Sequence, residues 1–229
     1  RQAGREHQKM KDIAVVPVKG LTDAKKRLAN YLSPNERKKL VRAMLLDVLK
    51  ALHESKSFAE VLVVSPDESL LQDAEQNHAV FLRQNGSGLN SAVQQATLSA
   101  SHEDVSSITT VLADLPLVEP RDFEELVQIS EQRPRVVLAP SLKGGTNVIL
   151  RTPPDIISTS YGRWSYAKHL RTAQKIGVLM YSISNSRLSF DLDTIDDLRA
   201  LRQLDSSGRS SAGRLARELG TLHSIAGNS

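Results

Sequence analysis

The sequence predicts an α/β fold, in which a mostly parallel sheet carries helices on both faces. Short runs of apolar and β-branched residues, typical of buried strands, alternate along the chain with longer segments of helical periodicity. This alternation is the pattern of βαβ units, whose strands lie parallel. With 229 residues, of which 40% are hydrophobic, the chain is long enough for one domain with a sizeable core.

The first two elements show both patterns. Residues 13–18, Ile-Ala-Val-Val-Pro-Val, predict a buried strand, and residues 35–54 predict the strongest helix. Ser33 can cap this helix, Pro34 suits its first turn, and Glu36 completes a capping-box pattern. The apolar residues of the helix recur at helical spacing and form one face: Leu40, Val41, Met44, Leu45, Val48, Leu49 and Leu52.

The remaining elements follow in alternation. Further strands are predicted at residues 61–64, 79–82, 108–113, 136–139, 147–150, 178–183 and 188–190. Further helices are predicted at residues 67–77, 89–101, 120–131, 164–175 and 194–204. We expect a single domain over residues 12–205, preceded by a polar extension at 1–11 and followed by a tail or short helix within 206–229, around residues 213–219.

Composition limits the classes of function. The absence of cysteine excludes disulfides, thiolate metal sites and cysteine nucleophiles. The net charge is +4, but no strand interleaves basic with aromatic residues, so we expect no nucleic-acid partner. No apolar run approaches the ~18 residues of a membrane span, and the first residues are polar. We therefore expect a cytoplasmic protein that does not contact a membrane.

Carboxylates follow two of the predicted strands. Asp114 stands just after the strand at 108–113, and Asp191 and Asp193 follow the strand at 188–190. Ligands of open α/β sheets bind at the carboxyl ends of strands, where carboxylates can hold Mg²⁺ against a nucleotide phosphate. Asp114 and Asp191 are therefore candidate Mg²⁺ ligands, and Asp193 either binds the metal or orients its ligands. The alternative for Asp114 is a simple turn residue.

Several cations leave the carboxyl end of the first predicted strand together. Lys19, Lys25 and Arg27 are candidate catalytic residues that would neutralise the phosphates of a bound triphosphate, with Lys19 and Lys25 binding the nucleotide. The alternative is a solvated basic helix face, which is what we expect of Lys26. The chain has no P-loop, and no G-x-G-x-x-G follows its first strand, which argues against P-loop enzymes and dinucleotide dehydrogenases.

A glycine-containing loop at residues 86–90 is a second candidate for nucleotide binding. Gly88 would let a nucleobase approach bare backbone, and Asn90 would read the edge of that base. A flexible loop that places Asn90 near a helix N-terminus is an equally good explanation.

Two further loops, at residues 144–147 and 162–165, place small residues and a hydroxyl near the start of an element. Backbone N–H groups there can bind an anion. The alternatives are a hairpin turn for the first loop and a capped helix for the second. Trp164, the only tryptophan, is expected to anchor the core, and His169 is expected at the surface or in packing.

Together and in this order, these segments resemble the 2-phospho-L-lactate guanylyltransferase family (CofC-like), which includes phosphoenolpyruvate guanylyltransferases and serves coenzyme F-420 biosynthesis. The resemblance covers the chain from about residue 13 to residue 204. The matching stretches are Pro17-Val-Lys with Ala24-Lys-Lys-Arg-Leu28, Val63-Val-Ser-Pro66, Gly88-Leu-Asn90, Ala113-Asp-Leu-Pro116, Gly145-Thr-Asn147, Gly162 to Ser165, and Asp191-Leu-Asp-Thr194.

The resemblance implies a fold like that of nucleotide-diphospho-sugar transferases (GT-A or Rossmann-like), so that the predicted domain is a nucleotidyltransferase. It also implies Mg²⁺ as cofactor and GTP as donor. It implies that Asp114 and Asp191 bind the metal, and that Thr146, Gly162 and Ser165 bind a phosphorylated three-carbon acid.

We therefore expect transfer of GMP from GTP to such an acid, with release of pyrophosphate, and a homodimer as the assembly. The first candidate acid is 2-phospho-L-lactate. Phosphoenolpyruvate and 3-phosphoglycerate stay open, because Arg163 and Trp164 replace the Pro-Gly that the family usually has between Gly162 and Ser165. The alternatives are a molybdopterin or isoprenoid-precursor nucleotidyltransferase, or a nucleotide-binding module without turnover.

Overall fold

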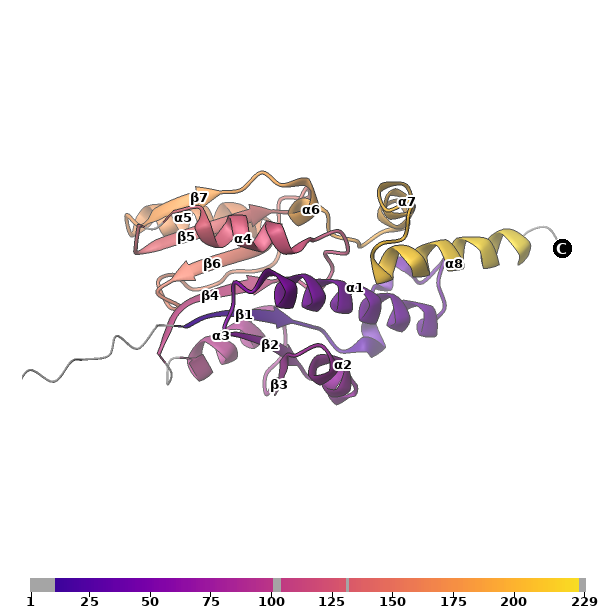
Figure 1. Ribbon diagram of the computed structural model, residues 1–229, viewed down its shortest axis with the longest axis horizontal. Coiled ribbons are helices and arrows are strands. Elements are labelled where there is room, and N and C mark those ends of the chain that lie inside the picture. Colours follow the sequence, from indigo (N-terminus) through magenta and orange to yellow (C-terminus); the bar gives the residue numbers. More distant parts are fainter. Residues whose placement is uncertain (1–10, 101–103, 131, 227–229) are drawn as a thin grey trace, which may run out of the picture.

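A computed structural model describes residues 11–100, 104–130 and 132–226 of the chain. Seven strands form one sheet in the order β3-β2-β1-β4-β6-β5-β7 (Figure 1). Their bounds are β1 Lys11–Pro17, β2 Glu60–Ser65, β3 Val80–Arg83, β4 Val105–Val111, β5 Arg135–Pro140, β6 Thr146–Thr152 and β7 Leu179–Ser182. β6 runs antiparallel to its neighbours β4 and β5, and every other pair is parallel. The prediction of a mostly parallel sheet is confirmed.

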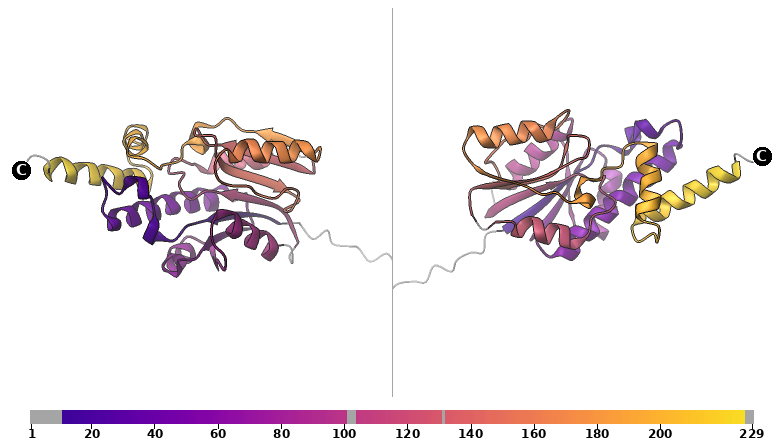
Figure 2. Two further views of the ribbon diagram at one scale, coloured as in Figure 1. Left: turned by 180° about the vertical axis from the view of Figure 1, so that it is seen from behind. Right: turned by 90° about the horizontal axis from the view of Figure 1, so that it is seen from above.

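Helices cover both faces of the sheet, as expected (Figure 2). They are α1 Pro34–Ser55, α2 Leu71–Gln76, α3 Leu89–Ala100, α4 Pro120–Gln128, α5 Ser165–Lys175, α6 Ser186–Ser189, α7 Ile195–Leu204 and α8 Ser211–Ala226. The larger apolar core lies between the sheet and the helices α1 and α4, and it continues between α1, α7 and α8. Two smaller apolar clusters lie on the other face, where α3 and α5 pack.

Helix α1 follows directly from its sequence. Ser33 and Glu36 form the predicted capping box, which satisfies two backbone N–H groups at the start of the helix. Its apolar face is buried, with Leu40, Leu45 and Val48 fully inaccessible. Burying one such side chain contributes roughly 1.5–3 kcal/mol, so this face is a main source of the stability of the large core.

One predicted strand is wrong. Residues 188–190, predicted as extended, lie at the end of the short helix α6 and just beyond it. The side chain of Asn185 accepts hydrogen bonds from the backbone N–H groups of Arg187 and Leu188, which starts a helical turn where the apolar residues alone indicated a strand. At residues 67–77 the predicted helix is divided into a 3₁₀ turn and α2.

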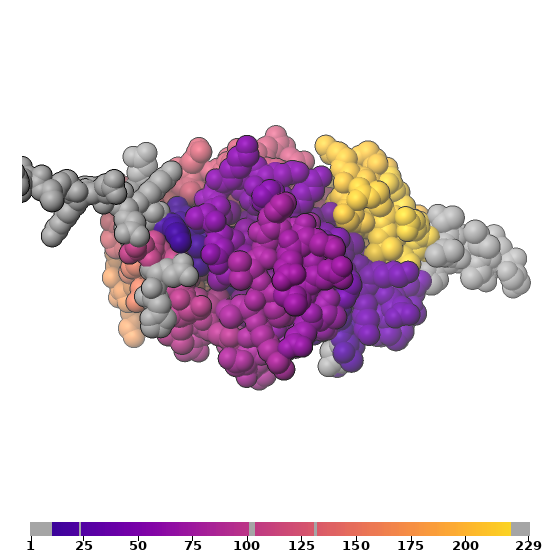
Figure 3. All heavy atoms as spheres, turned by 60° about the horizontal axis from the view of Figure 1, so that its bottom comes forward, coloured from indigo at the N-terminus to yellow at the C-terminus, as the bar shows by residue number. Residues whose placement is uncertain are grey.

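Helix α8 includes the short helix expected near residues 213–219 and is longer. It packs against α1 and α7, and Figure 3 shows it in yellow beside residues from early in the chain. Asp47 on α1 accepts hydrogen bonds from the backbone N–H groups of Ser211 (2.6 Å) and Ala212 (2.9 Å) at the start of α8. In the described part of the chain, no helix is both long enough and apolar enough to cross a bilayer.

The strand order reverses beside β1, since β2 and β3 lie on one side of it and β4 on the other. In open α/β sheets, the crevice at such a point, outside the carboxyl ends of the strands, is where ligands bind. Because β6 is antiparallel, its first residue, Thr146, lies at this same edge. Val148 of β6 pairs with Val111 at the end of β4, and the N–H of Leu112 donates to the carbonyl of Asn147.

Candidate functional site

A cavity of about 460 Å³ opens at the carboxyl ends of β1 and β4. Five of the predicted site residues line it: Lys19, Lys25, Arg27, Asp114 and Asp193. Residues from α1 and the start of α3 complete its walls. The structure therefore brings together the predicted cations and two of the three predicted carboxylates, although they come from segments far apart in the sequence.

Lys25 is the centre of this group. Its Nζ lies 2.8 Å from Asp114 Oδ2 and 2.8 Å from Asp193 Oδ1, and it donates a hydrogen bond to each. The side chain of Lys25 is only 10% exposed, so both ion pairs are shielded from solvent. Arg27 Nη1 lies farther from Asp193, at 3.9 Å, and Arg27 is largely exposed.

Backbone contacts hold these side chains in place. The N–H of Leu192 donates to the carbonyl of Asp114, which fixes the segment after β4 against the segment that carries Asp193. Lys25 has left-handed backbone angles (φ 48°, ψ 49°). A residue with a Cβ adopts this region at a cost of about 1–2 kcal/mol, and such strain is concentrated at functional sites.

The charges of the three residues stabilise one another. Burial alone would lower the pKa of Lys25, but Asp114 and Asp193 outweigh it, so the pKa lies above its usual value. Burial would raise the pKa of Asp193, but the ammonium of Lys25 outweighs it, so the pKa lies below its usual value. At neutral pH the site therefore holds a charged lysine between carboxylates.

The carboxylates also fit a divalent cation. Asp114 Oδ1 is buried and has no hydrogen-bond partner, while Asp114 Oδ2 and Asp193 Oδ1 already converge on one cationic nitrogen. Mg²⁺ commonly takes one or two carboxylates and completes its shell with waters and substrate phosphates. Within residues 11–100, 104–130 and 132–226, no three acidic or histidine side chains converge on one metal position. Phosphate and water oxygens would therefore supply the other ligands.

Asp191, the other predicted metal ligand, has different partners. Its Oδ1 accepts a hydrogen bond from Ser141 (2.6 Å), and its Oδ2 lies 3.3 Å from Lys143 Nζ. Lys143 also pairs with Asp197 at 2.8 Å, and its charge reaches Asp193. Metal binding by Asp191 stays a prediction.

Thr146, Gly162 and Ser165 lie where β6 and α5 begin. Gly162 has φ +116°, a conformation that side chains rarely adopt, and its carbonyl accepts the N–H of Ser165. Thr146 and Ser165 are almost inaccessible, at 1% and 2% exposure. Thr146 Oγ1 lies 2.9 Å from Nδ1 of His169. A ligand that reached these hydroxyls would be largely removed from water.

The loop before α3 connects the cavity to this second group. Gly88 has φ +83°, and Leu89 beside it lines the cavity. Asn90 binds backbone on both sides of its amide: Oδ1 accepts the N–H of Tyr161 at 2.7 Å, and Nδ2 donates to the carbonyl of Tyr161 at 3.3 Å. Asn90 therefore fixes the segment that leads into Gly162, and its reading of a nucleobase stays a prediction.

Sequence comparison assigns the chain to a family. The family model described as "Guanylyl transferase CofC like" matches residues 12–220. The chain belongs to this family. It is 38% identical to the phosphoenolpyruvate guanylyltransferase of Rubrobacter xylanophilus, over 87% of this chain and 96% of the relative. It is 33% identical to the 2-phospho-L-lactate guanylyltransferase of Methanocaldococcus jannaschii, over 80% of this chain and 79% of the relative.

Solved structures confirm the fold class. A putative nucleotide-diphospho-sugar transferase from Desulfovibrio desulfuricans has a TM-score of 0.75 at 19% identity, covering 92% of this chain and 96% of that one. A cytidylyltransferase from Leptospira borgpetersenii has a TM-score of 0.60 at 15% identity, covering 94% and 96%. The nucleotide-diphospho-sugar-transferase-like fold expected from the sequence is therefore the fold of this family member.

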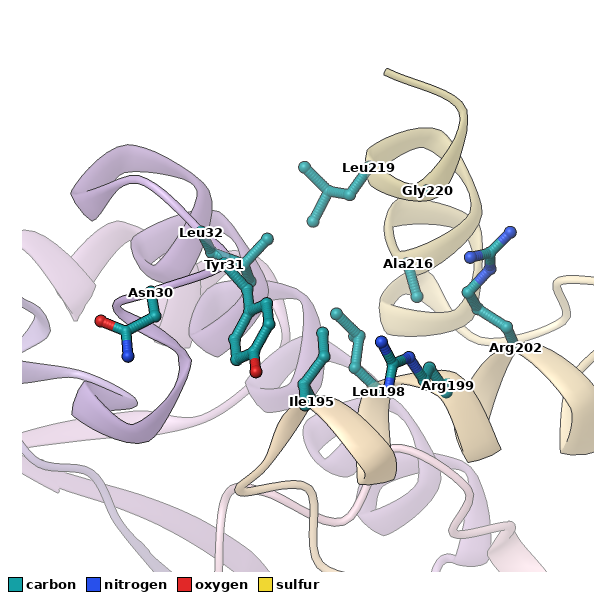
Figure 4. A pocket seen from close by; sticks show the side chains of 10 residues that line it. All are labelled: Asn30, Tyr31, Leu32, Ile195, Leu198, Arg199, Arg202, Ala216, Leu219 and Gly220. Atoms are coloured by element: carbon teal, nitrogen blue, oxygen red, sulfur yellow. The ribbon is translucent and has the colours of Figure 1, made fainter. Parts of the chain in front are cut away.

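A second cavity, of about 420 Å³, lies away from the predicted site residues (Figure 4). It is formed between residues 30–32, α7 and α8, and Figure 4 shows the side chains of Tyr31, Ile195 and Leu198 lying close to one another. Most of the other lining residues are apolar, and Arg199 and Arg202 add two positive charges to the lining.

One expectation about an aromatic residue on the acceptor side of the site is wrong. Trp164, expected to anchor the core, is 58% exposed, because its left-handed backbone (φ 58°) turns the ring outward over Gly144 and beside Arg163. Of the two places expected for His169, the structure shows packing: the residue is completely buried against Tyr161, and it also makes two polar contacts. Lys143 was also missed, because a single lysine in a turn carries no pattern.

Proposed function

We propose that the protein transfers the guanylyl group of GTP to a phosphorylated three-carbon acid and releases pyrophosphate. The observation that carries the proposal is the pair Asp114 and Asp193, bridged by Lys25 in a cavity that Lys19 and Arg27 also line. Family membership supports the reaction class, since the relatives cited above are named guanylyltransferases.

The residues would act mainly by neutralising charge. In the proposed reaction an oxygen of the acid's phosphate attacks the α-phosphorus of GTP, and the bond to the leaving pyrophosphate breaks. That phosphate is already ionised at neutral pH, so no protein base is needed. Lys19, Lys25 and Arg27 would bind the β- and γ-phosphates and offset the charge that develops on pyrophosphate. Lys25 would exchange its carboxylate partners for phosphate oxygens when the nucleotide binds.

We include Mg²⁺ in this proposal as the cofactor. Asp114 and Asp193 would hold it, with Asp191 as a further ligand or as a residue that orients the others. When bound, Mg²⁺ supplies charge neutralisation at the α-phosphate. Asp114 Oδ1, buried without a partner, supports this role for Asp114.

The acid would bind beside the cavity, at Thr146, Gly162 and Ser165. The relatives' names include both phosphoenolpyruvate and 2-phospho-L-lactate, so both belong in a test panel, together with 3-phosphoglycerate. The product class would enter coenzyme F-420 biosynthesis. Arg163 is exposed next to Gly162 and adds a positive charge close to the proposed binding site of the acid.

Guanine selectivity is proposed for the loop before α3, with Gly88 and Asn90. We also propose a cytoplasmic location, since GTP and phosphorylated acids are metabolites of that compartment. A homodimer is proposed as the assembly, and light scattering of the purified protein would test it. Neither a membrane nor a nucleic acid is needed as a partner.

Pyrophosphate release tests the proposed function most simply. GTP, ATP and CTP are each combined with 2-phospho-L-lactate, phosphoenolpyruvate or 3-phosphoglycerate in the presence of Mg²⁺. We expect rapid release only with GTP and at least one acid. Equal kcat/KM for the three nucleotides would favour a less selective nucleotidyltransferase, and no release from any pair would favour a binding module without turnover.

A further inference from the structure

A buried histidine lies directly behind one of the residues proposed to bind the acid. His169 on α5 is completely inaccessible, and its ring packs edge to face with that of Tyr161, with 5.4 Å between the ring centroids. Its Nδ1 lies 2.9 Å from Thr146 Oγ1, and its Nε2 lies 2.8 Å from the backbone nitrogen of Ser160. Both ring nitrogens are therefore engaged.

The contact with Ser160 decides which ring nitrogen carries the proton. A backbone N–H can only donate, so Nε2 must accept and cannot itself be protonated. In a neutral imidazole the proton then lies on Nδ1. Nδ1 therefore donates to Thr146 Oγ1, and the hydroxyl of Thr146 accepts this bond.

The consequence lies in the hydroxyl hydrogen of Thr146. Because its oxygen accepts from the ring, the Thr146 O–H remains available as a donor, and within the described residues the only hydrogen-bond partner of Oγ1 is His169. Thr146 is 1% exposed, so water hardly reaches this group. A buried donor without an acceptor has a free-energy cost. An anionic oxygen at this position would accept the hydrogen bond and remove that cost.

We propose that His169 is a positioning residue, which holds the Thr146 hydroxyl as a hydrogen-bond donor toward the anionic groups of the acid. This inference rests on the proposed function, because it takes Thr146 as a contact of the acid. Ser165, the other hydroxyl proposed for the acid, begins the same helix one turn before His169. Helix α5 therefore carries Ser165, which would bind the acid, and His169, which would orient Thr146 toward it.

The surroundings of the ring keep it neutral. Burial, together with the positive charges of Arg151 and Lys168, lowers the pKa of His169 to about 4. An imidazolium would also place a second donor against the N–H of Ser160. His169 therefore fixes a hydrogen-bond direction and does not exchange protons near neutral pH.

The tautomer can be measured without any turnover. The ¹⁵N chemical shifts of the His169 ring in the full chain at pH 7 distinguish a protonated nitrogen from an unprotonated one. We expect the protonated type at Nδ1 and the unprotonated type at Nε2, with the His169→Gln variant used to assign the signals. A proton on Nε2, or on both nitrogens, would overturn the proposal.

Two amide variants separate positioning from a purely structural role. His169→Asn can place an amide NH₂ near the position of Nδ1 and keep a donor to Thr146, but it loses the acceptor for Ser160. His169→Gln can place its carbonyl near the position of Nε2 and keep that acceptor, but it loses the donor. We expect His169→Gln to raise the KM for the acid about tenfold, His169→Asn to stay closer to wild type, and the KM for GTP to change little in both.

The opposite ranking, with His169→Gln closer to wild type than His169→Asn, would overturn the proposal, because it would mean that holding the Ser160 segment is what matters. In a Thr146→Val background, His169→Gln should have no further effect on the KM for the acid. A further tenfold increase of this KM would also contradict the proposed role of His169. A wild-type enzyme that transfers no guanylyl group, yet shows the proton on Nδ1, would overturn the proposed function while the geometry inferred at Thr146 stands.

Discussion

Lys25 competes with any metal ion for the carboxylates of Asp114 and Asp193. In the structure its ammonium holds the two carboxylates at 2.8 Å each, which relieves their mutual repulsion. Binding of a metal–nucleotide complex would transfer these carboxylates to the metal and free Lys25 for the phosphates. One side chain can thus keep the site assembled before the substrate arrives and take part in the reaction afterwards.

The metal assignment predicts a large loss of activity on neutralising single carboxylates. Asp114→Asn and Asp193→Asn should each abolish turnover, a loss of at least about a hundredfold in kcat/KM, while the circular dichroism spectrum stays that of the wild type. Asp196→Asn is the matched control, since its side chain is 83% exposed and pairs only with Arg199 in the described structure. Near-wild-type rates for both active-site variants at saturating Mg²⁺ would exclude these residues as ligands.

The acceptor assignment predicts a selective effect at Ser165. Ser165→Ala should raise the KM for the acid and leave the KM for GTP nearly unchanged. Loss of one hydrogen bond to a charged group costs about 1.5–3 kcal/mol, or roughly ten- to a hundredfold in kcat/KM for the acid. Steady-state kinetics with each substrate varied in turn measure this. Weaker binding of GTP alone would mean that the acid binds on another side of the nucleotide.

His169 makes the stability of the protein depend on pH. The pKa of His169 is held at about 4 in the folded state, compared with 6.5 when unperturbed. Between these values the unfolded chain binds a proton that the folded protein excludes. Protonation of the unfolded chain therefore lowers the free energy of unfolding as the pH falls from 6.5 toward 4. Above pH 6.5 the stability is not reduced in this way. The loss should be on the order of 3 kcal/mol.

Urea unfolding of the wild type and of His169→Gln at several pH values would measure that contribution. The difference between their free energies of unfolding should shrink as the pH drops from 6.5 to 4. A difference that stays constant over this range would mean that the folded protein accepts the proton.

At the scale of elements, features that depend on neighbouring residues could be predicted from the sequence, and contacts between distant segments could not. Helix α1 was predictable because its capping box and apolar face lie within one continuous segment. The cap of α8 could not be predicted, because Asp47, which provides it, lies 164 residues before Ser211 in the chain. The contact of His169 with Thr146 joins a helix to a strand, so no spacing in the sequence indicates it. The strand predicted at 188–190 failed because one capping side chain outweighed the apolar pattern.

The turn between β5 and β6 packs against the ring of Trp164. Gly144 has φ +79°, and a Cβ added there would lie 2.9 Å from the ring of Trp164. Gly177 has φ +69° with open space around it. Gly177→Ala should therefore lose only about 1 kcal/mol from backbone strain, whereas Gly144→Ala should lose about 2–3 kcal/mol because the ring must also move. Equal losses in urea unfolding would mean that the Trp164 ring does not rest on this turn.

At the scale of the whole molecule, the sheet order explains why residues from distant segments meet. β1 and β4 are parallel neighbours, so Lys19 and Lys25 after one strand approach Asp114 after the other. The antiparallel β6 returns Thr146 to the same edge. This general location was predictable from the strand-end pattern, but the choice of Asp193 over Asp191 as the partner of Lys25 depends on the path of the chain after α6.

The bond that breaks in GTP is the most direct test of the proposed reaction. The enzyme is incubated with Mg²⁺, the preferred acid, and GTP labelled with ³²P at either the α- or the γ-phosphate. If the acid attacks the α-phosphorus, the α-label will appear in the acid adduct and the γ-label in pyrophosphate. Transfer of the γ-label to the acid, or its release as inorganic phosphate with GDP as the other product, would contradict guanylyl transfer at this site.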